Sequence, residues 1–191
     1  LTRSSGSGLH PLPDLSQHPL EVPPLVFETI GFWIELPAAL PAAYSQQGLH
    51  FMGGIHATEH ATIGLFPLLT IADRDDIGGI SYTGHPQTGG PAVFVYDGVP
   101  GGAGLAVQGF EEIERLVDRT LELVEGCPCE DGCPACIQSP KCGNGNKPLD
   151  KAAALLTLQL TLPHFSRVAA TSLRQNASSL MSPCKKRTSW P

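Results

Sequence analysis

Hydrophobic and polar positions alternate along this chain in short runs that favour several brief strands and helices. The run 25–36 is dense in β-branched and aromatic residues, which predicts one strand, or two strands broken at Gly31. Pro37 is expected to end it. Residues 77–83 and 91–97 predict two further strands. A loop containing glycine and proline joins them, so we expect these strands to be neighbours in a sheet.

Helical periodicity is clearest over 110–125, where apolar residues recur at steps of three and four and form one stripe. Residues 54–73 also predict helix, and Pro67 should kink or split it because proline lacks a backbone donor. A third helix is predicted over 149–160. The residues expected in the core of the 54–73 stretch are Ile55, Ile63, Phe66, Leu68, Leu69 and Ile71.

These elements predict a domain that combines helices with a few short strands. We expect residues 1–24 to be a linker or edge segment, because they are rich in proline, serine and glycine. Residues 25–162 would form the domain. Residues 163–191 show little pattern and are expected to be a disordered tail, in which Cys184 is an incidental thiol.

Composition narrows the classes of function. The chain has 191 residues with 21 glycines and 18 prolines, which indicates many turns. A net charge of −6 argues against a stand-alone DNA-binding domain, which usually carries a basic stripe. No apolar stretch approaches the roughly 20 residues of a membrane span, so we expect no membrane partner. The start lacks an initiator methionine and a signal-peptide core, so we expect a cytoplasmic piece of a longer polypeptide.

Five of the six cysteines lie in one loop, where a thiolate cluster would suit a soft tetrahedral cation. The spacing C-x-C-x3-C-x2-C supplies four donors, and zinc is the usual occupant. A disulfide knot is the alternative, but the cysteines are confined to one loop and the C-x-C pair is too close to bridge easily. The loop cysteines are Cys127, Cys129, Cys133, Cys136 and Cys142.

A second motif competes for the function. His56, Glu59 and His60 match H-x-x-E-H, the inverted zinc-peptidase pattern. On a helix the two histidines would share one face and could share a metal, with Glu59 nearby as a base. A peptidase also needs a third protein ligand, and histidines in a packed helical junction give the same pattern by hydrogen bonding.

Two further segments have structural interpretations that we prefer. The glycine-rich stretch 97–104 follows a strand and precedes a helix, but it lacks the Lys-Ser/Thr ending of a phosphate-binding loop. Its glycines are therefore expected to allow tight packing. The acidic stretch 73–76 could bind magnesium, although a solvated cap with a salt bridge is the commoner arrangement.

Several of these motifs together resemble the MrfA-like zinc-binding domain, the module at the C-terminus of DEAD/DEAH-box DNA helicases related to MrfA. The resemblance covers roughly 25–160 in the right order. It is carried by Gly54-Ile55-His56-Ala57, Glu59-His60-Ala61, Asp75-Asp76-Ile77-Gly78-Gly79, Val95-Tyr96-Asp97-Gly98, Pro100-Gly101-Gly102-Ala103-Gly104, and the cysteine loop through Lys151.

The resemblance implies an accessory domain of α+β fold, with a small mixed sheet, packed helices and a zinc-binding cysteine loop that holds a structural Zn²⁺. The domain would belong to an ATP-dependent helicase that serves DNA repair. Its partners would be the helicase motor domains and, through the parent helicase, DNA. This sequence contains no Walker A or Asp-Glu-x-His motif, so we expect no enzyme activity from the chain alone. The ligands carry over most securely onto Cys129, Cys133 and Cys136.

The fourth ligand is expected to be Cys127, with Cys142 as the alternative. Two other functions stay open at this point. One is a metallopeptidase that uses His56, Glu59 and His60, and the other is a zinc-dependent protein-interaction module.

Overall fold

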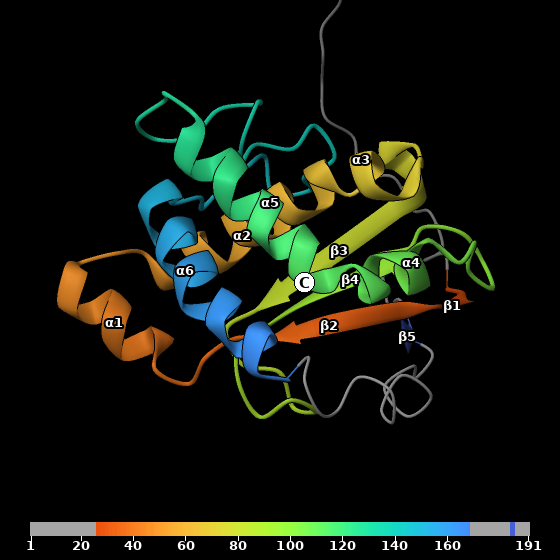
Figure 1. Cartoon of the computed structure of the whole chain (residues 1–191), viewed down its shortest axis with the longest axis horizontal. Helices are drawn as coiled ribbons and strands as arrows, with labels where there is room; N and C mark the ends of the chain where they lie inside the picture. The colour runs from red at the N-terminus through yellow and green to blue at the C-terminus, as the bar shows by residue number, and fades with distance from the viewer. Residues whose placement is uncertain (1–25, 169–183, 186–191) are drawn as a thin grey trace, which may run out of the picture.

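An antiparallel sheet of three strands forms the base of the molecule (Figure 1). The structure, a computed structural model, describes residues 26–168 and 184–185. The strands are β2 (Gly31–Glu35), β3 (Ile77–Tyr82) and β4 (Ala92–Asp97), in the order β2-β4-β3. The register pairs Phe32 with Val95 and Ile80 with Phe94. The predicted α+β class is confirmed, and every pairing in this sheet is antiparallel.

Helices pack above this sheet (Figure 1). The longest are α2 (Phe51–Leu65), α5 (Ile113–Gly126) and α6 (Lys151–Val168). Helix α2 packs against β3 and β4, and α5 and α6 pack against α2 in turn. The remaining elements are α1 (Leu40–Gln47), α3 (Pro67–Thr70), the 3-10 turn η1 (Arg74–Asp76), α4 (Leu105–Glu111), β1 (Glu28–Thr29) and β5 (Cys184–Lys185).

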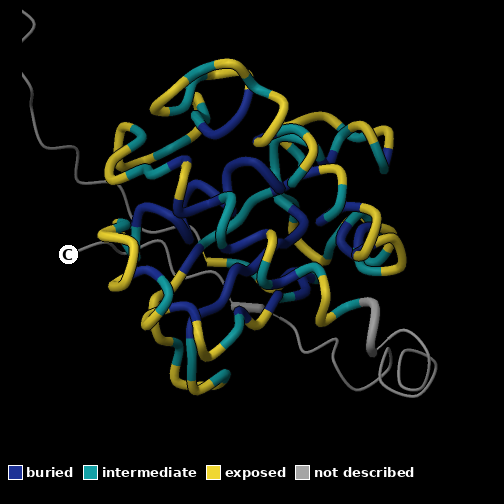
Figure 2. The backbone as a smooth tube through the Cα atoms, turned by 60° about the vertical axis from the view of Figure 1, so that its left-hand side comes forward, coloured by how far each residue is buried: buried dark blue, intermediate teal, exposed yellow. Residues whose placement is uncertain are grey.

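The core lies between the sheet and the helices, and Figure 2 shows the buried stretches gathered in the interior of the molecule. Alternation along β2 sends Phe32 and Ile34 into this core, as the strand period requires. Helix α2 is enclosed on nearly every side, because ten of its residues in succession, 53–62, are buried. The candidate residues His56, Glu59 and His60 therefore lie inside the protein.

Several predicted elements are confirmed. The helix expected over 54–73 is split at Pro67 into α2 and α3, and the two strands after it are neighbours. Ile55 and Phe66 are fully buried as expected. Leu68 and Ile71 were wrong as core residues, because they are 78% and 98% exposed at the end of this segment.

Three differences concern helix boundaries. No helix was predicted where α1 begins, at Leu40. The helix expected over 110–125 is two helices, with Glu112 between α4 and α5 in a non-helical conformation. Helix α6 continues through Pro163 to Val168, where no structure was expected.

The other parts of the expected end segments, residues 1–24, 169–183 and 186–191, lie outside the described residues. Within the described part, no helix combines the length and apolar composition needed to cross a bilayer.

The glycine-rich stretch 97–104 is closed by a side chain of the protein itself. The Asp97 carboxylate accepts backbone N–H bonds from Ala103, Gly104 and Ala106 at 2.5, 2.7 and 2.6 Å. These are the donors that a phosphate would use at a helix start. The loop therefore carries its own anion, in agreement with the structural interpretation.

The acidic stretch 73–76 also has a structural role. The Asp73 side chain accepts from the Asp75 backbone, and Asp76 bonds back to the Asp73 N–H, forming a capping box for η1. The Lys141 ammonium lies 3.6 Å from the Asp75 carboxylate. The expected solvated cap is confirmed, and its salt bridge is made by Lys141 from outside the turn.

Candidate metal centre

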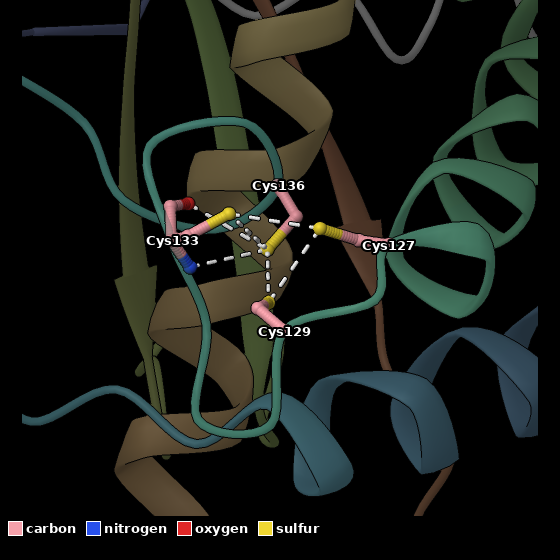
Figure 3. Close-up of side chains that lie close together, drawn as sticks. All are labelled: Cys127, Cys129, Cys133 and Cys136. Atoms are coloured by element: carbon pink, nitrogen blue, oxygen red, sulfur yellow. Dashed lines mark hydrogen bonds between the residues drawn. The ribbon is translucent and has the colours of Figure 1, made fainter.

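Helix α5 delivers the chain directly into the cysteine loop, because Cys127 follows its last residue (Figure 3). The loop doubles back beside α2 and brings four sulfurs together from one short segment. The Sγ–Sγ distances run from 3.5 to 3.8 Å. The four residues are Cys127, Cys129, Cys133 and Cys136.

These distances suit a tetrahedral metal. Zn–S bonds of about 2.3 Å place the sulfurs of a zinc tetrathiolate about 3.8 Å apart. The observed separations are close to that value and far longer than a disulfide bond. All the cysteines of the loop are free thiols, so the disulfide knot considered from sequence is not formed.

The turn between the last two cysteines holds its shape through backbone contacts. The Cys136 N–H donates to the Cys133 carbonyl at 3.0 Å, and the Cys133 N–H points at the Cys136 sulfur at 3.3 Å. Gly132 has a φ of 102°, which only glycine adopts easily. The Ile137 side chain fills the space where a Gly132 side chain would lie.

A buried lysine holds the other end of the loop. The Lys151 ammonium, at the start of α6, donates to the carbonyls of Cys127 and Cys129 at 2.7 and 2.6 Å. Lys151 is 7% exposed, and none of the salt bridges among the described residues includes it. A buried cation without a carboxylate needs negative charge nearby.

The sulfurs influence one another's ionisation. Burial acts to raise the pKa of Cys129, but hydrogen bonds from the neighbouring thiols lower it to about 7. Burial raises the pKa of Cys136 to about 12. The cluster thus stabilises one thiolate by itself, and a divalent cation would stabilise the other three in the same way.

Cys142 lies apart from this cluster. Its sulfur is 3.5 Å from the Nε2 of His56, and together with His60 it forms a second group of donor atoms, all within 4.8 Å of one another. The two histidines share one face of α2, with ring centroids 4.2 Å apart, as the i, i+4 spacing predicted. Sequence reasoning did not place Cys142 there, because only the folded loop brings it back to α2.

Glu59 lies beside this second group but is not one of its donors. It is 8% exposed, and its side chain is hydrogen-bonded to Ser81. Burial raises the pKa of Glu59 to about 7, against the lowering effect of that bond. Burial also lowers the pKa of His60 to about 4, helped by His56 and opposed by the bond to Ile137.

Comparison with known proteins identifies the family. A family model for the MrfA Zn-binding domain matches residues 58–137. The chain is also 41% identical, over 111 residues, to an uncharacterized protein of Methanocaldococcus jannaschii, covering 56% of this chain and 99% of that one. The chain belongs to the MrfA Zn-binding domain family. The family match includes the four clustered cysteines and ends before Cys142.

Other relatives of this MrfA Zn-binding domain are helicases. ATP-dependent helicase HRQ1 of Saccharomyces cerevisiae is 30% identical over 152 residues, which is 74% of this chain and 14% of the helicase. The crystal structure of DUF1998 helicase MrfA bound to DNA has a TM-score of 0.49 and 29% identity, covering 58% of this chain and 14% of that one. The chain thus spans a small part of the helicases it matches.

Proposed function

We propose that this chain is a structural zinc-binding accessory domain of an ATP-dependent DNA helicase that acts in DNA repair. The zinc ion is held by Cys127, Cys129, Cys133 and Cys136. The domain contains no motor of its own. It acts by packing against the motor domains and shaping the path of the DNA strand. A cytoplasmic location and the domain limits 25–162 are part of the same proposal.

The sulfur tetrahedron is the observation that carries this proposal. Four thiolates close the coordination sphere of zinc, which leaves no position for water and gives the ion a structural role. Four thiolates and one Zn²⁺ also carry a net charge of −2, which explains why a buried ammonium, that of Lys151, lies against the loop. Cys142 cannot join this set while its sulfur lies beside His56.

Cadmium NMR tests the ligand assignment, because cadmium replaces zinc and its resonance frequency depends on the number of sulfur ligands. We expect a resonance typical of four thiolates. It should be absent in Cys133→Ser and present in Cys142→Ser, which serves as the matched control. Loss of that resonance in Cys142→Ser, or its persistence in Cys133→Ser, would show that the assignment is wrong.

The helicase relatives and the charge of the chain support the accessory role. The relatives named as helicases are about six to seven times longer than the stretch they share with this chain. A chain with a net charge of −6 is poorly suited to bind the phosphates of DNA unless basic partner domains assist it. Metal binding of this kind contributes folding free energy on the order of 10 kcal/mol.

Two measurements test the accessory role. The isolated chain should hydrolyse no ATP, and fluorescence anisotropy should detect no tight binding to single-stranded DNA. The coding sequence upstream of Leu1 should contain the motor motifs of a helicase in the same frame. DNA-stimulated ATPase activity of the chain alone would contradict the proposal, as would an upstream sequence that encodes no motor.

The M. jannaschii relative favours a second candidate function. This chain covers 99% of that relative, so the domain is nearly the whole of that protein. A module of this kind would act through protein contacts with a partner on another chain. Under this alternative the upstream sequence would encode no motor, and the zinc-loaded chain would bind a separate helicase, with binding lost on chelation.

A further inference from the structure

Helix α2 and the loop after the cysteine cluster meet at a second group of metal-binding side chains. His56 and His60 come from α2, and Cys142 comes from the loop 138–148. One ring nitrogen of each histidine and the Cys142 sulfur all lie within 4.8 Å of one another. Both histidines are buried, while Cys142 is partly exposed.

The hydrogen bonds of the histidines fix their tautomers. The Nδ1 of His56 lies 2.9 Å from the Pro148 carbonyl, and the Nδ1 of His60 lies 2.9 Å from the Ile137 carbonyl. A carbonyl can only accept, so each Nδ1 must carry the proton. The Nε2 atoms of the neutral rings are therefore lone-pair donors. Metal-binding histidines are oriented by this same kind of bond to a backbone carbonyl.

The Cys142 loop is held closed around its sulfur. Asn146 bonds both backbone groups of Ser139, with its Oδ1 accepting at 2.7 Å and its Nδ2 donating at 3.0 Å. The Asn146 backbone N–H also points at the Cys142 sulfur at 3.3 Å. An N–H directed at sulfur stabilises the thiolate, which is the form that binds metals.

The spacing agrees with a shared ion. Zn–S bonds of about 2.3 Å and Zn–N bonds of about 2.0 Å place sulfur and nitrogen about 3.5 Å apart on a tetrahedron. The observed distance from Cys142 Sγ to His56 Nε2 is 3.5 Å.

The group also borders a pocket of about 480 Å³, lined in addition by Glu59, Ser81 and Asn144. One side of the three donors is thus open to solvent.

We propose that His56, His60 and Cys142 form a second zinc site, with three protein ligands and a water molecule from the pocket in the fourth position. This site is distinct from the four-cysteine centre and uses none of its ligands. It would fasten the loop after the cysteine cluster to the buried helix α2. His60 also joins the two centres, because its Nδ1 bonds the carbonyl of the residue that follows Cys136.

A metal-free arrangement is the competing explanation. Cys142 could donate a simple S–H bond to His56, and the histidines would then only hold the helix to the loop. The two explanations differ in the number of metals per chain. They also differ in the effect of removing Cys142, which lies partly exposed at the edge of the junction.

Cadmium NMR and metal analysis of the full chain decide between them. We expect two cadmium ions per chain and two resonances, one typical of four thiolates and one typical of mixed nitrogen and sulfur ligands. The mixed resonance should disappear in Cys142→Ser and in His60→Asn, with the loss of one metal. The control His85→Asn alters a histidine that contacts Tyr82 and Phe94, away from both centres, and should keep both resonances.

The cadmium spectrum and metal content of the wild-type chain test the proposal even if a variant fails to fold. A single four-thiolate resonance and one metal per chain in the wild type would overturn the second site and leave the first intact. Retention of two metals by a folded Cys142→Ser chain would also overturn it. Loss of the four-thiolate resonance in Cys133→Ser while the mixed resonance persists would support two independent sites.

Discussion

Buried polar side chains hold several elements of the fold together, and each has hydrogen-bond partners. No buried side-chain nitrogen or oxygen among the described residues lacks a hydrogen bond. The Lys151 ammonium holds the loop entrance, and the Asp97 carboxylate holds the start of α4. Tyr44 holds α1 to α6, since its hydroxyl donates to the Ala153 carbonyl at 2.9 Å and also contacts the Thr157 hydroxyl.

Tyr44 gives a prediction with a defined pH dependence. Burial raises the pKa of Tyr44 to about 12, whereas a tyrosine in the unfolded chain titrates at about 10. The unfolded state therefore loses this proton first. The stability that the neutral hydroxyl contributes is present below about pH 10 and is lost as the pH rises toward about 12.

The variant Tyr44→Phe should lose about 1 kcal/mol at neutral pH, because one buried hydrogen bond is removed. Denaturant unfolding of the two proteins should show that this difference narrows above about pH 10. A difference that stays constant up to about pH 11 would contradict the assigned role of the hydroxyl.

At the scale of residues, the sequence predicted the four-cysteine cluster but not where Cys142 lies. Four cysteines at short spacing must lie close together, so Cys127, Cys129, Cys133 and Cys136 could be grouped from their positions alone. The position of Cys142 depends on a turn that Asn146 holds through hydrogen bonds. The pattern of hydrophobic and polar residues does not predict such a turn.

At the scale of elements, α2 is the centre of the fold. It contacts the sheet on one side and α5 and α6 on the others, and it carries both histidines of the second group. Close packing against α6 occurs at Gly54, where an added Cβ would lie 2.5 Å from the Ala153 Cβ and would also clash with the Tyr44 hydroxyl. At Gly64, in the last turn of the same helix, the nearest atom to such a Cβ is 3.8 Å away.

Alanine at these two glycines should have opposite effects. Gly54→Ala should destabilise the protein by about 1–3 kcal/mol, because α6 or Tyr44 must shift. Gly64→Ala should stabilise it by about 0.5–1 kcal/mol, because alanine favours the helix and meets no neighbour. Thermal unfolding checks both, and a neutral Gly54→Ala would show that α2 and α6 are not in close contact.

The sequence predicted elements well where one rule acted alone. Two short apolar runs joined by a loop with glycine and proline predicted β3 and β4, and the missing donor of Pro67 predicted the break between α2 and α3. It failed where tertiary packing decides. Pro163 lies within α6 although proline usually ends a helix, and Glu112 interrupts what reads as one continuous amphipathic helix.

At the scale of the whole molecule, the segment 127–150 links α5 to α6 with almost no regular structure of its own. Cys136 and Ile137 anchor it in the core, and the cysteine cluster, Lys151 and the group around Cys142 hold the rest of it. Metal binding would therefore join the ends of α5 and α6 to α2.

Hydrogen–deuterium exchange before and after chelation tests this account most directly. Removal of zinc should abolish protection of the amides in the cysteine loop and in the last turns of α5, and re-addition of zinc should restore it, since the bound metal contributes folding free energy on the order of 10 kcal/mol. Sheet amides in β4 serve as the internal reference. Identical protection of the loop and of α5 in the zinc-loaded and metal-free chains would contradict the structural role of zinc.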